Sequence, residues 1–259
     1  MSNFPNTYHT AIGSDSNIGW QMEPGEQAAM VAMLAGLRPQ LAIEIGSRYG
    51  GSMQVLSRYA RRVISLDIDP TCRERLGPRF PNAEFITGDS SQTFRPLLEK
   101  LDREAAALRF ILIDGDHSAS GVKCDIECLL EYRPTCPLFV VMHDSFNPNV
   151  RSGIRSARWS ENQFVHSVEL DYLPGILAKG GEENREMWGG FALAILLPVP
   201  RAAHLVVTAR MQHMFAAVFR HSVHWFFDPP TLARRCSNKI QNLFRNSLNL
   251  NFRRKTRDT

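Results

Sequence analysis

Residues 41–52 read Leu-Ala-Ile-Glu-Ile-Gly-Ser-Arg-Tyr-Gly-Gly-Ser, and this stretch decides the fold. A short apolar run that carries one acidic residue, Glu44, breaks into a glycine-rich turn, and a second apolar run, residues 61–67, ends on Asp67. Two such runs separated by a helix-length segment are typical of a strand–helix–strand unit. The glycines let the turn approach a bound molecule, and a carboxylate at the neighbouring strand tip can accept hydrogen bonds from ribose hydroxyls. The stretch therefore predicts a pocket for a nucleoside-like ligand.

The composition is that of an ordinary globular protein. The chain has 259 residues, of which 44% are hydrophobic and 22% are charged, enough for one large α/β domain with appendages or for two small domains. It has no apolar run of about 18 residues and no signal-like N-terminus, so neither a membrane-spanning helix nor secretion is expected. Five scattered cysteines fit reduced thiols better than a disulfide framework. We therefore expect a cytoplasmic protein.

Short apolar runs alternate with helical patterns through the first half of the chain. Buried parallel strands are predicted at residues 41–45, 63–67, 84–87, 110–114 and 138–143. Apolar residues at helical spacing predict helices over 24–37 and 120–131. Strands with helical crossovers imply a Rossmann-like, doubly wound α/β sheet.

The pattern changes after residue 150. Residues 164–172 and 188–197 are predicted as a sixth and a seventh strand, with a polar loop over 175–186 that is a candidate lid. Two C-terminal helices, 202–226 and 230–248, are predicted on either side of Pro229-Pro230. The predicted organisation is an N-terminal extension (1–23), a main domain (24–200) and a basic helical extension (201–259).

The C-terminal extension is strongly basic. Of the net charge of +4, residues 201–259 contribute +9, which leaves −5 for the first 200 residues. Its apolar stripe bordered by Lys and Arg suits a helix pair docked on the main domain, a homo-oligomer interface, or contact with anionic lipids at the inner membrane face. Charge alone suits nucleic acid as well, but no known nucleic-acid-binding motif is present, and we expect no nucleic-acid partner.

Polar residues follow five consecutive predicted strands, where an open parallel sheet binds its ligands. Helix capping explains any one of them, but it does not explain all five together. The five tips are Glu44 with the glycine turn, Asp67 with Asp69, Gly88-Asp89-Ser90, Asp114-Gly115-Asp116-His117, and His143-Asp144-Ser145. We expect these residues to line one functional site.

Residues 25–198 resemble the class I S-adenosylmethionine-dependent methyltransferases, whose last strand is antiparallel in a seven-stranded sheet. The resemblance rests on residues 44–47, Asp67 and 88–90. It implies that Gly46 and Ser47 pass the methionine part of the cofactor, that Glu44 orients nearby groups, that Asp67 holds the ribose, and that Asp89 and Ser90 meet the adenine. A dinucleotide-dependent dehydrogenase is the competing interpretation, but the glycine spacing of residues 46–51 does not fit its fingerprint.

Residues 113–118 and 141–145 resemble the metal-dependent O-methyltransferases that act on sugars and related natural products. This resemblance implies that Asp114 and Asp144 bind Mg²⁺ and that His117 is the general base. His143 stands where those enzymes usually carry a glutamate ligand, and a nitrogen ligand suits Mg²⁺ less well than a carboxylate oxygen. Three alternatives stay open: Asp116 supplies the missing charge, the site accepts Mn²⁺, or no metal binds.

The function expected from both resemblances is methylation of a hydroxyl on a sugar or on a glycosylated or glycolipid natural product. Two alternatives are a phenol or catechol O-methyltransferase and a non-catalytic regulatory subunit that keeps the cofactor pocket. The first usually has a lysine just after the first metal aspartate, where this chain has residues 117–120, His-Ser-Ala-Ser. Trp159, Tyr172 and Trp188 are either a sugar-stacking wall or part of the core.

Overall fold

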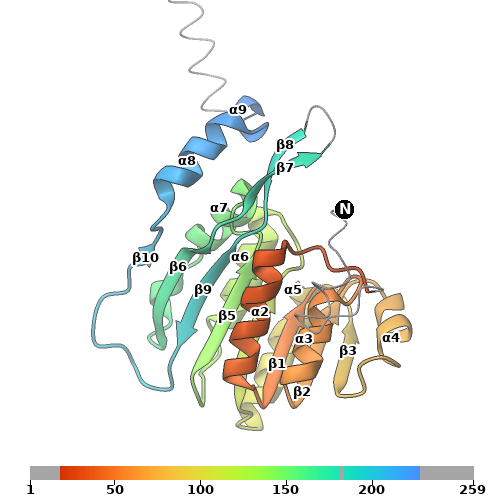
Figure 1. Cartoon of the computed structure of the whole chain (residues 1–259). Coiled ribbons are helices and arrows are strands. Elements are labelled where there is room, and N and C mark those ends of the chain that lie inside the picture. The colour runs from red at the N-terminus through yellow and green to blue at the C-terminus, as the bar shows by residue number, and fades with distance from the viewer. Residues whose placement is uncertain (1–17, 181–183, 228–259) are drawn as a thin grey trace, which may run out of the picture. The chain divides into compact units, whose positions relative to one another are not determined.

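The computed structural model describes residues 18–180 and 184–227 (Figure 1). The described residues fall into two compact units: residues 18–176 with 188–212, and residues 177–180 and 184–187 with 213–227. The first unit contains the sheet and every residue that the sequence analysis assigned to the site. No helix in these two ranges is long and apolar enough to cross a membrane.

The described part of the first unit is built on an eight-stranded sheet. All neighbouring strands are parallel except at β9, which runs antiparallel to both of its neighbours. Across the sheet the strands are β10 (Val207–Thr208), β6 (Val165–Leu173), β9 (Phe191–Leu196), β5 (Leu138–His143), β4 (Leu108–Ile113), β1 (Leu41–Ile45), β2 (Arg62–Asp67) and β3 (Ala83–Thr87). This is the predicted doubly wound sheet with its last long strand antiparallel, but it has eight strands instead of the expected seven because the short β10 is added at its edge.

Helices cover both faces of the sheet, and each face has its own apolar core. One core is formed with α2 (Pro24–Leu37), α3 (Gly51–Tyr59) and α4 (Thr71–Leu76), and the other with α5 (Ser90–Arg103), α6 (Ala119–Leu129) and α7 (Pro148–Ser156). Figure 1 shows α2 and α3 in front of β1 and β2, with α5 and α6 behind the sheet. Because both faces are covered, all five residues of β1 are buried, Glu44 among them.

The register of the central strands brings the predicted site residues together. Ile45 pairs with Leu66 on one side and with Ile113 on the other, and Ile113 pairs with Met142. The residues that follow these four positions therefore emerge side by side at the carboxyl edge of the sheet. The chain reverses its winding direction between β1 and β4, which is where doubly wound sheets open a ligand crevice.

The predicted elements are confirmed up to residue 150, with the bounds of α2, β1 and β5 as expected. Later parts differ. Residues 175–186 are not a loop: β7 (Ile176–Gly180) pairs with β8 (Asn184–Trp188) in a separate two-stranded sheet. The predicted seventh strand is β9 alone, because Gly189 and Gly190 separate it from β8 with positive φ angles of 72° and 81°.

The C-terminal region is less helical than expected. Instead of one helix over 202–226, the structure has β10, α8 (Gln212–His221) and α9 (His224–Phe227). A 3-10 turn at Trp159–Glu161 completes the described elements. The predicted helix 230–248 and most of the basic stripe lie outside the described residues, so the three-part organisation and the role of the tail stay predictions.

Candidate active site

A cavity of about 700 Å³ runs along the carboxyl edge of the central strands. Nearly all of the predicted site residues line it. They are Gly46, Ser47, Asp67, Asp89, Ser90, Asp114, His117, His143 and Asp144. Residues from five strand tips therefore line one continuous cavity in the first unit.

The glycine turn after β1 packs directly on the end of β4. Gly46 has a φ of +89°, and a Cβ on it would lie 2.2 Å from the backbone carbonyl oxygen of Asp114. Its N–H donates to the carbonyl of Leu66, and the N–H of Asp114 donates to the carbonyl of Ile45. Only glycine fits this position, so the turn holds the β1, β2 and β4 tips at fixed separations.

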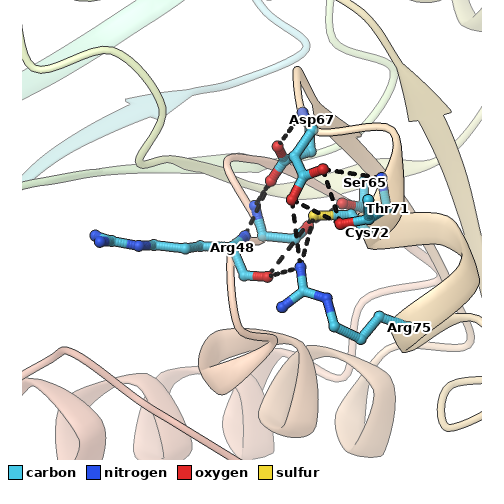
Figure 2. A network of polar contacts seen from close by, with 8 residues as sticks. Arg48, Ser65, Asp67, Thr71, Cys72 and Arg75 are labelled. Carbon is cyan, nitrogen blue, oxygen red and sulfur yellow. Dashed lines mark hydrogen bonds and ion pairs between the residues drawn. The ribbon is translucent and has the colours of Figure 1, made fainter.

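Asp67 organises the other side of the turn. Its Oδ2 accepts hydrogen bonds from the backbone N–H groups of Ser47 (2.8 Å) and Arg48 (2.9 Å), and its Oδ1 accepts from the N–H of Asp69 (2.8 Å). Figure 2 shows the Arg48 side chain extending away from this network while its backbone takes part in it. The guanidinium of Arg75 donates to the Arg48 carbonyl at 2.8 Å. The carboxylate thus reaches the cavity already held by the backbone of the first turn.

The neighbouring acidic residues hold turns and helix ends. Asp69 accepts from the N–H of Thr71, as expected for a turn former. Asp89 caps α5 by accepting from the N–H of Ser91, and Asp116 accepts from the N–H and the hydroxyl of Ser118 at the start of α6. Asp116 is therefore occupied at the helix end, outside the carboxylate and histidine cluster described below.

Glu44 lies beneath the turn and does not line the cavity. It is fully buried, and it accepts hydrogen bonds from the hydroxyls of Ser47 (2.9 Å) and Ser52. Ser47 also contacts the hydroxyl of Ser65. Burial raises the pKa of Glu44 to about 8, opposed by the two serine hydroxyls and reinforced by Asp114 and Asp67. Its side chain thus supports the turn from inside the core.

Glu44 gives the fold a dependence on pH. Its pKa rises from the ordinary 4.5 to about 8 on folding, so the folded chain holds one proton more than the unfolded chain between these values. The contribution of Glu44 to the free energy of unfolding therefore falls as pH rises through this window, by about 1.4 kcal/mol per pH unit. We expect Glu44→Gln, which cannot ionise, to lack this part of the fall.

The measurement is denaturant unfolding of both proteins between about pH 5 and pH 8, with the difference between them taken at each pH. Taking the difference cancels the other titrating groups, such as Asp125, whose pKa burial raises to about 6. Parallel curves for the two proteins across this window would contradict a buried, titrating Glu44.

Two carboxylates and two imidazoles meet where β4 and β5 end. The Nδ1 atom of His143 lies 2.8 Å from Oδ1 of Asp114 and 3.5 Å from Oδ2 of Asp144. The Nε2 atom of His117 lies 2.8 Å from Oδ2 of Asp144 and 3.7 Å from Oδ1 of Asp114. His117 is the most open of the four, with 38% of its side chain exposed, whereas His143 is 7% exposed. The cluster is therefore largely buried, and of its two imidazoles, which both line the cavity, that of His117 is the more exposed.

The pKa values follow from these contacts. Burial raises the pKa of Asp114, but the charge of His143 and hydrogen bonds with both histidines outweigh burial and lower it to about 2. Hydrogen bonds to Asp114 and Asp144 raise the pKa of His117 to about 9. Burial lowers the pKa of His143, but Asp114, Glu26 and Asp144 outweigh it and hold this pKa well above the usual value. Asp114 is thus ionised, and each imidazole favours the protonated form.

The cluster can hold a divalent cation. Asp114, His143 and Asp144 each offer one ligand atom, and these atoms lie within 4.8 Å of one another. Two carboxylate oxygens and an imidazole nitrogen suit Mn²⁺ as ligands. They also suit Mg²⁺, mainly through the two carboxylate oxygens. The three residues present therefore fit the metal that the sequence predicted.

The sequence analysis missed Glu26 of α2, which also lines the cavity. Of the three aromatic candidates, Trp188 lines the cavity and stands edge-to-face with His117 at a ring-centre distance of 5.5 Å. Trp159 is buried in the core and donates to the Ile154 carbonyl at 2.7 Å. Tyr172 is exposed and is absent from the cavity lining.

Comparisons with known proteins agree with this architecture. Residues 43–145 match the family model described as a methyltransferase domain. Rhamnosyl O-methyltransferases of Mycobacterium tuberculosis and Mycobacterium bovis are 27% identical to this chain over 104 residues, which is 38% of this chain and 42% of each relative. The chain thus aligns with about two fifths of the length of these curated relatives.

A solved O-methyltransferase of Bacillus cereus in complex with SAH has the same fold. The superposition covers 74% of this chain and 89% of that one, with a TM-score of 0.50 and 16% sequence identity. The matched family model, the antiparallel last strand and the cavity at the strand tips agree with this fold, and together they make the chain similar to the class I S-adenosylmethionine-dependent methyltransferases.

Proposed function

We propose that this protein transfers a methyl group from S-adenosylmethionine to a hydroxyl oxygen of a sugar, either free or carried by a lipid or another natural product. The observation that carries the proposal is the cluster of Asp114, His117, His143 and Asp144, which opens into the same cavity as the glycine turn and Asp67. A cofactor pocket next to an acidic centre with an exposed imidazole suits a hydroxyl nucleophile. The rhamnosyl O-methyltransferase relatives support a sugar acceptor.

The cofactor half of the cavity is assigned to the tips of β1, β2 and β3. In this assignment Gly46 and Ser47 pass the methionine part, Asp67 accepts hydrogen bonds from the ribose, and Asp89 with Ser90 meets the adenine. Asp67 suits its role because its carboxylate is held in place by three backbone N–H groups before any ligand arrives. Glu44 acts from beneath by holding Ser47.

The acceptor half is assigned to the cluster and to Trp188. A sugar hydroxyl has a pKa far above neutral, so its proton must leave as the bond to the methyl carbon forms. His117 faces the cavity and is the proton acceptor in this proposal. A Mg²⁺ or Mn²⁺ ion held by Asp114, His143 and Asp144 would favour the alkoxide by binding the acceptor oxygen. Trp188 offers an aromatic wall beside His117 for the apolar face of a sugar ring.

Holding the acceptor in line with the sulfonium methyl supplies a large part of the rate in such a reaction, because the methyl group needs no further activation. The chain's own contribution is therefore to fix the two substrates. The glycine turn is held on the Asp114 backbone, so the cofactor half and the acceptor half of the cavity share one rigid element.

The test combines binding and turnover in the full chain. Calorimetry with S-adenosylhomocysteine, with and without Mg²⁺ or Mn²⁺, should show binding of the nucleoside and, separately, of the metal. A radiolabelled methyl-transfer screen over sugars, glycolipids and catechols should then label a sugar hydroxyl. No affinity for the nucleoside would overturn the proposal, and labelling of catechols alone would replace the sugar by a phenolic acceptor.

A further inference from the structure

A buried carboxylate from outside the matched family segment reaches the acidic cluster. Glu26 lies in the first turn of α2, ahead of residues 43–145, and only 3% of it is exposed. Burying a carboxylate is costly unless it finds charge or hydrogen-bond partners. The burial of Glu26 next to the cluster therefore depends on the partners of its carboxylate.

Glu26 has three contacts. Its Oε2 accepts the backbone N–H of Glu23 at 2.6 Å, which is one half of the capping box of α2. Its Oε1 accepts the N–H of Gly190 at 2.5 Å. The same Oε1 lies 3.3 Å from Nε2 of His143, an ion-pair contact that lacks the direction of a regular hydrogen bond. Capping explains the first contact, but it does not explain the other two.

The two ring nitrogens of His143 face different carboxylates. Nδ1 faces Asp114 and Asp144, whose oxygens are its partners in the candidate metal centre. Nε2 faces Glu26, which is not among the described residues whose ligand atoms lie within 4.8 Å of one another. Glu26 therefore stands behind the imidazole rather than in the cluster.

We propose that Glu26 is a positioning residue that holds the Nε2–H of His143, so that the Nδ1 lone pair points at a divalent cation between Asp114 and Asp144. The inference rests on the metal centre of the proposed function. A histidine that binds a metal commonly donates its other N–H to a carboxylate, which fixes the tautomer and the ring orientation. In this chain that carboxylate comes from α2.

Glu26 also has a structural contact, with the backbone of the Gly189–Gly190 pair, that is distinct from its contact with His143. The N–H of Gly189 donates to Oδ1 of Asp144 at 2.5 Å, while the next N–H, of Gly190, donates to Glu26. A Cβ on Gly189 would lie 2.8 Å from Oε1 of Glu26, so the two glycines are packed tightly between the carboxylates. Loss of Glu26 could therefore move Asp144 without any effect through His143.

The test is Mn²⁺ binding to the full chain in the presence of S-adenosylhomocysteine, followed by the electron paramagnetic resonance signal of free Mn²⁺. Glu26→Gln should weaken Mn²⁺ binding by about 10- to 100-fold, the usual effect of losing the outer partner of a metal-bound histidine. Glu23→Gln is the matched control, because Glu23 caps the same helix and lines the same cavity but is not among the carboxylates that pair with His143 in the described residues. It should leave the Mn²⁺ affinity within about threefold of that of the parent.

A double-mutant cycle decides between the two roles. If Glu26 acts through His143, adding Glu26→Gln to a His143→Gln protein should change Mn²⁺ affinity by less than about twofold. If Glu26→Gln lowers Mn²⁺ affinity equally in the parent and in the His143→Gln protein, the positioning role is overturned. Glu26 would then act by holding Gly189 and Gly190 in place. An unchanged affinity of the Glu26→Gln single variant would overturn the positioning role as well, while the proposed metal centre stands. A parent protein that binds no Mn²⁺ would overturn both, and the methyl-transfer screen would still test the reaction itself.

Discussion

Replacing Asp114 by alanine is expected to lower the rate of methyl transfer by about a thousandfold while S-adenosylmethionine still binds. Asp114, like Asp144, lies within 4 Å of both histidines of the cluster, and it is a ligand in the proposed metal centre. The stabilisation of developing negative charge by a bound metal amounts to several kcal/mol, and each 1.36 kcal/mol is about a tenfold change in rate. Loss of this carboxylate should therefore remove nearly all turnover.

Cofactor affinity should survive the change. Gly46 packs against the backbone carbonyl of Asp114, which alanine keeps, and Asp67 is held by backbone groups of residues 47, 48 and 69. Calorimetry with S-adenosylhomocysteine checks this point, and single-turnover kinetics check the rate. Asp102→Ala removes an exposed carboxylate near the end of α5 that does not line the cavity, and it should leave both measurements unchanged. Normal turnover by Asp114→Ala would contradict the metal-assisted mechanism.

The sequence predicted the sheet because its signals were local. Short, mostly apolar runs bounded by turns are typical of parallel strands buried on both faces, and such runs predicted the bounds of β1 and β5. The β7–β8 hairpin was missed because residues 176–188 are polar and glycine-containing, without the alternation that marks a half-buried strand. β10 has only two residues, too few for any periodicity to show.

The site was predictable where it depends on topology. Parallel strands end at one edge, so residues at the ends of β2, β4 and β5 were expected in one site, and Asp67, Asp114 and Asp144 line one cavity. The depth of Glu44 was not predictable, because a strand buried on both faces does not show which side chain turns away from the ligand. The approach of Glu26 to His143 is set by how α2 packs on the sheet, and the sequence around Glu26 signals only a helix cap.

His117 is expected to set the acid limb of the pH–rate profile. Only a neutral imidazole can accept the proton of the acceptor hydroxyl, and hydrogen bonds to Asp114 and Asp144 raise the pKa of His117 to about 9. Without added metal, kcat/KM should therefore rise with pH up to about 9. Added Mg²⁺ or Mn²⁺ competes for the same two carboxylates, so it should move this limb to lower pH.

His117→Gln should lower kcat by about 10²- to 10⁴-fold and remove the limb, because glutamine keeps a polar side chain but cannot accept the proton. His166→Gln is the matched control, since His166 lies near the start of β6, does not line the cavity, and contacts the Val199 carbonyl. A profile that keeps the same limb in His117→Gln would assign proton removal to another group. A limb that stays at the same pH with and without metal would show that the ion does not share Asp114 and Asp144 with His117. The first result tests whether His117 is the base, and the second tests whether Asp114 and Asp144 bind the metal. Two separate tests are needed because His117 lies within 4 Å of both aspartates.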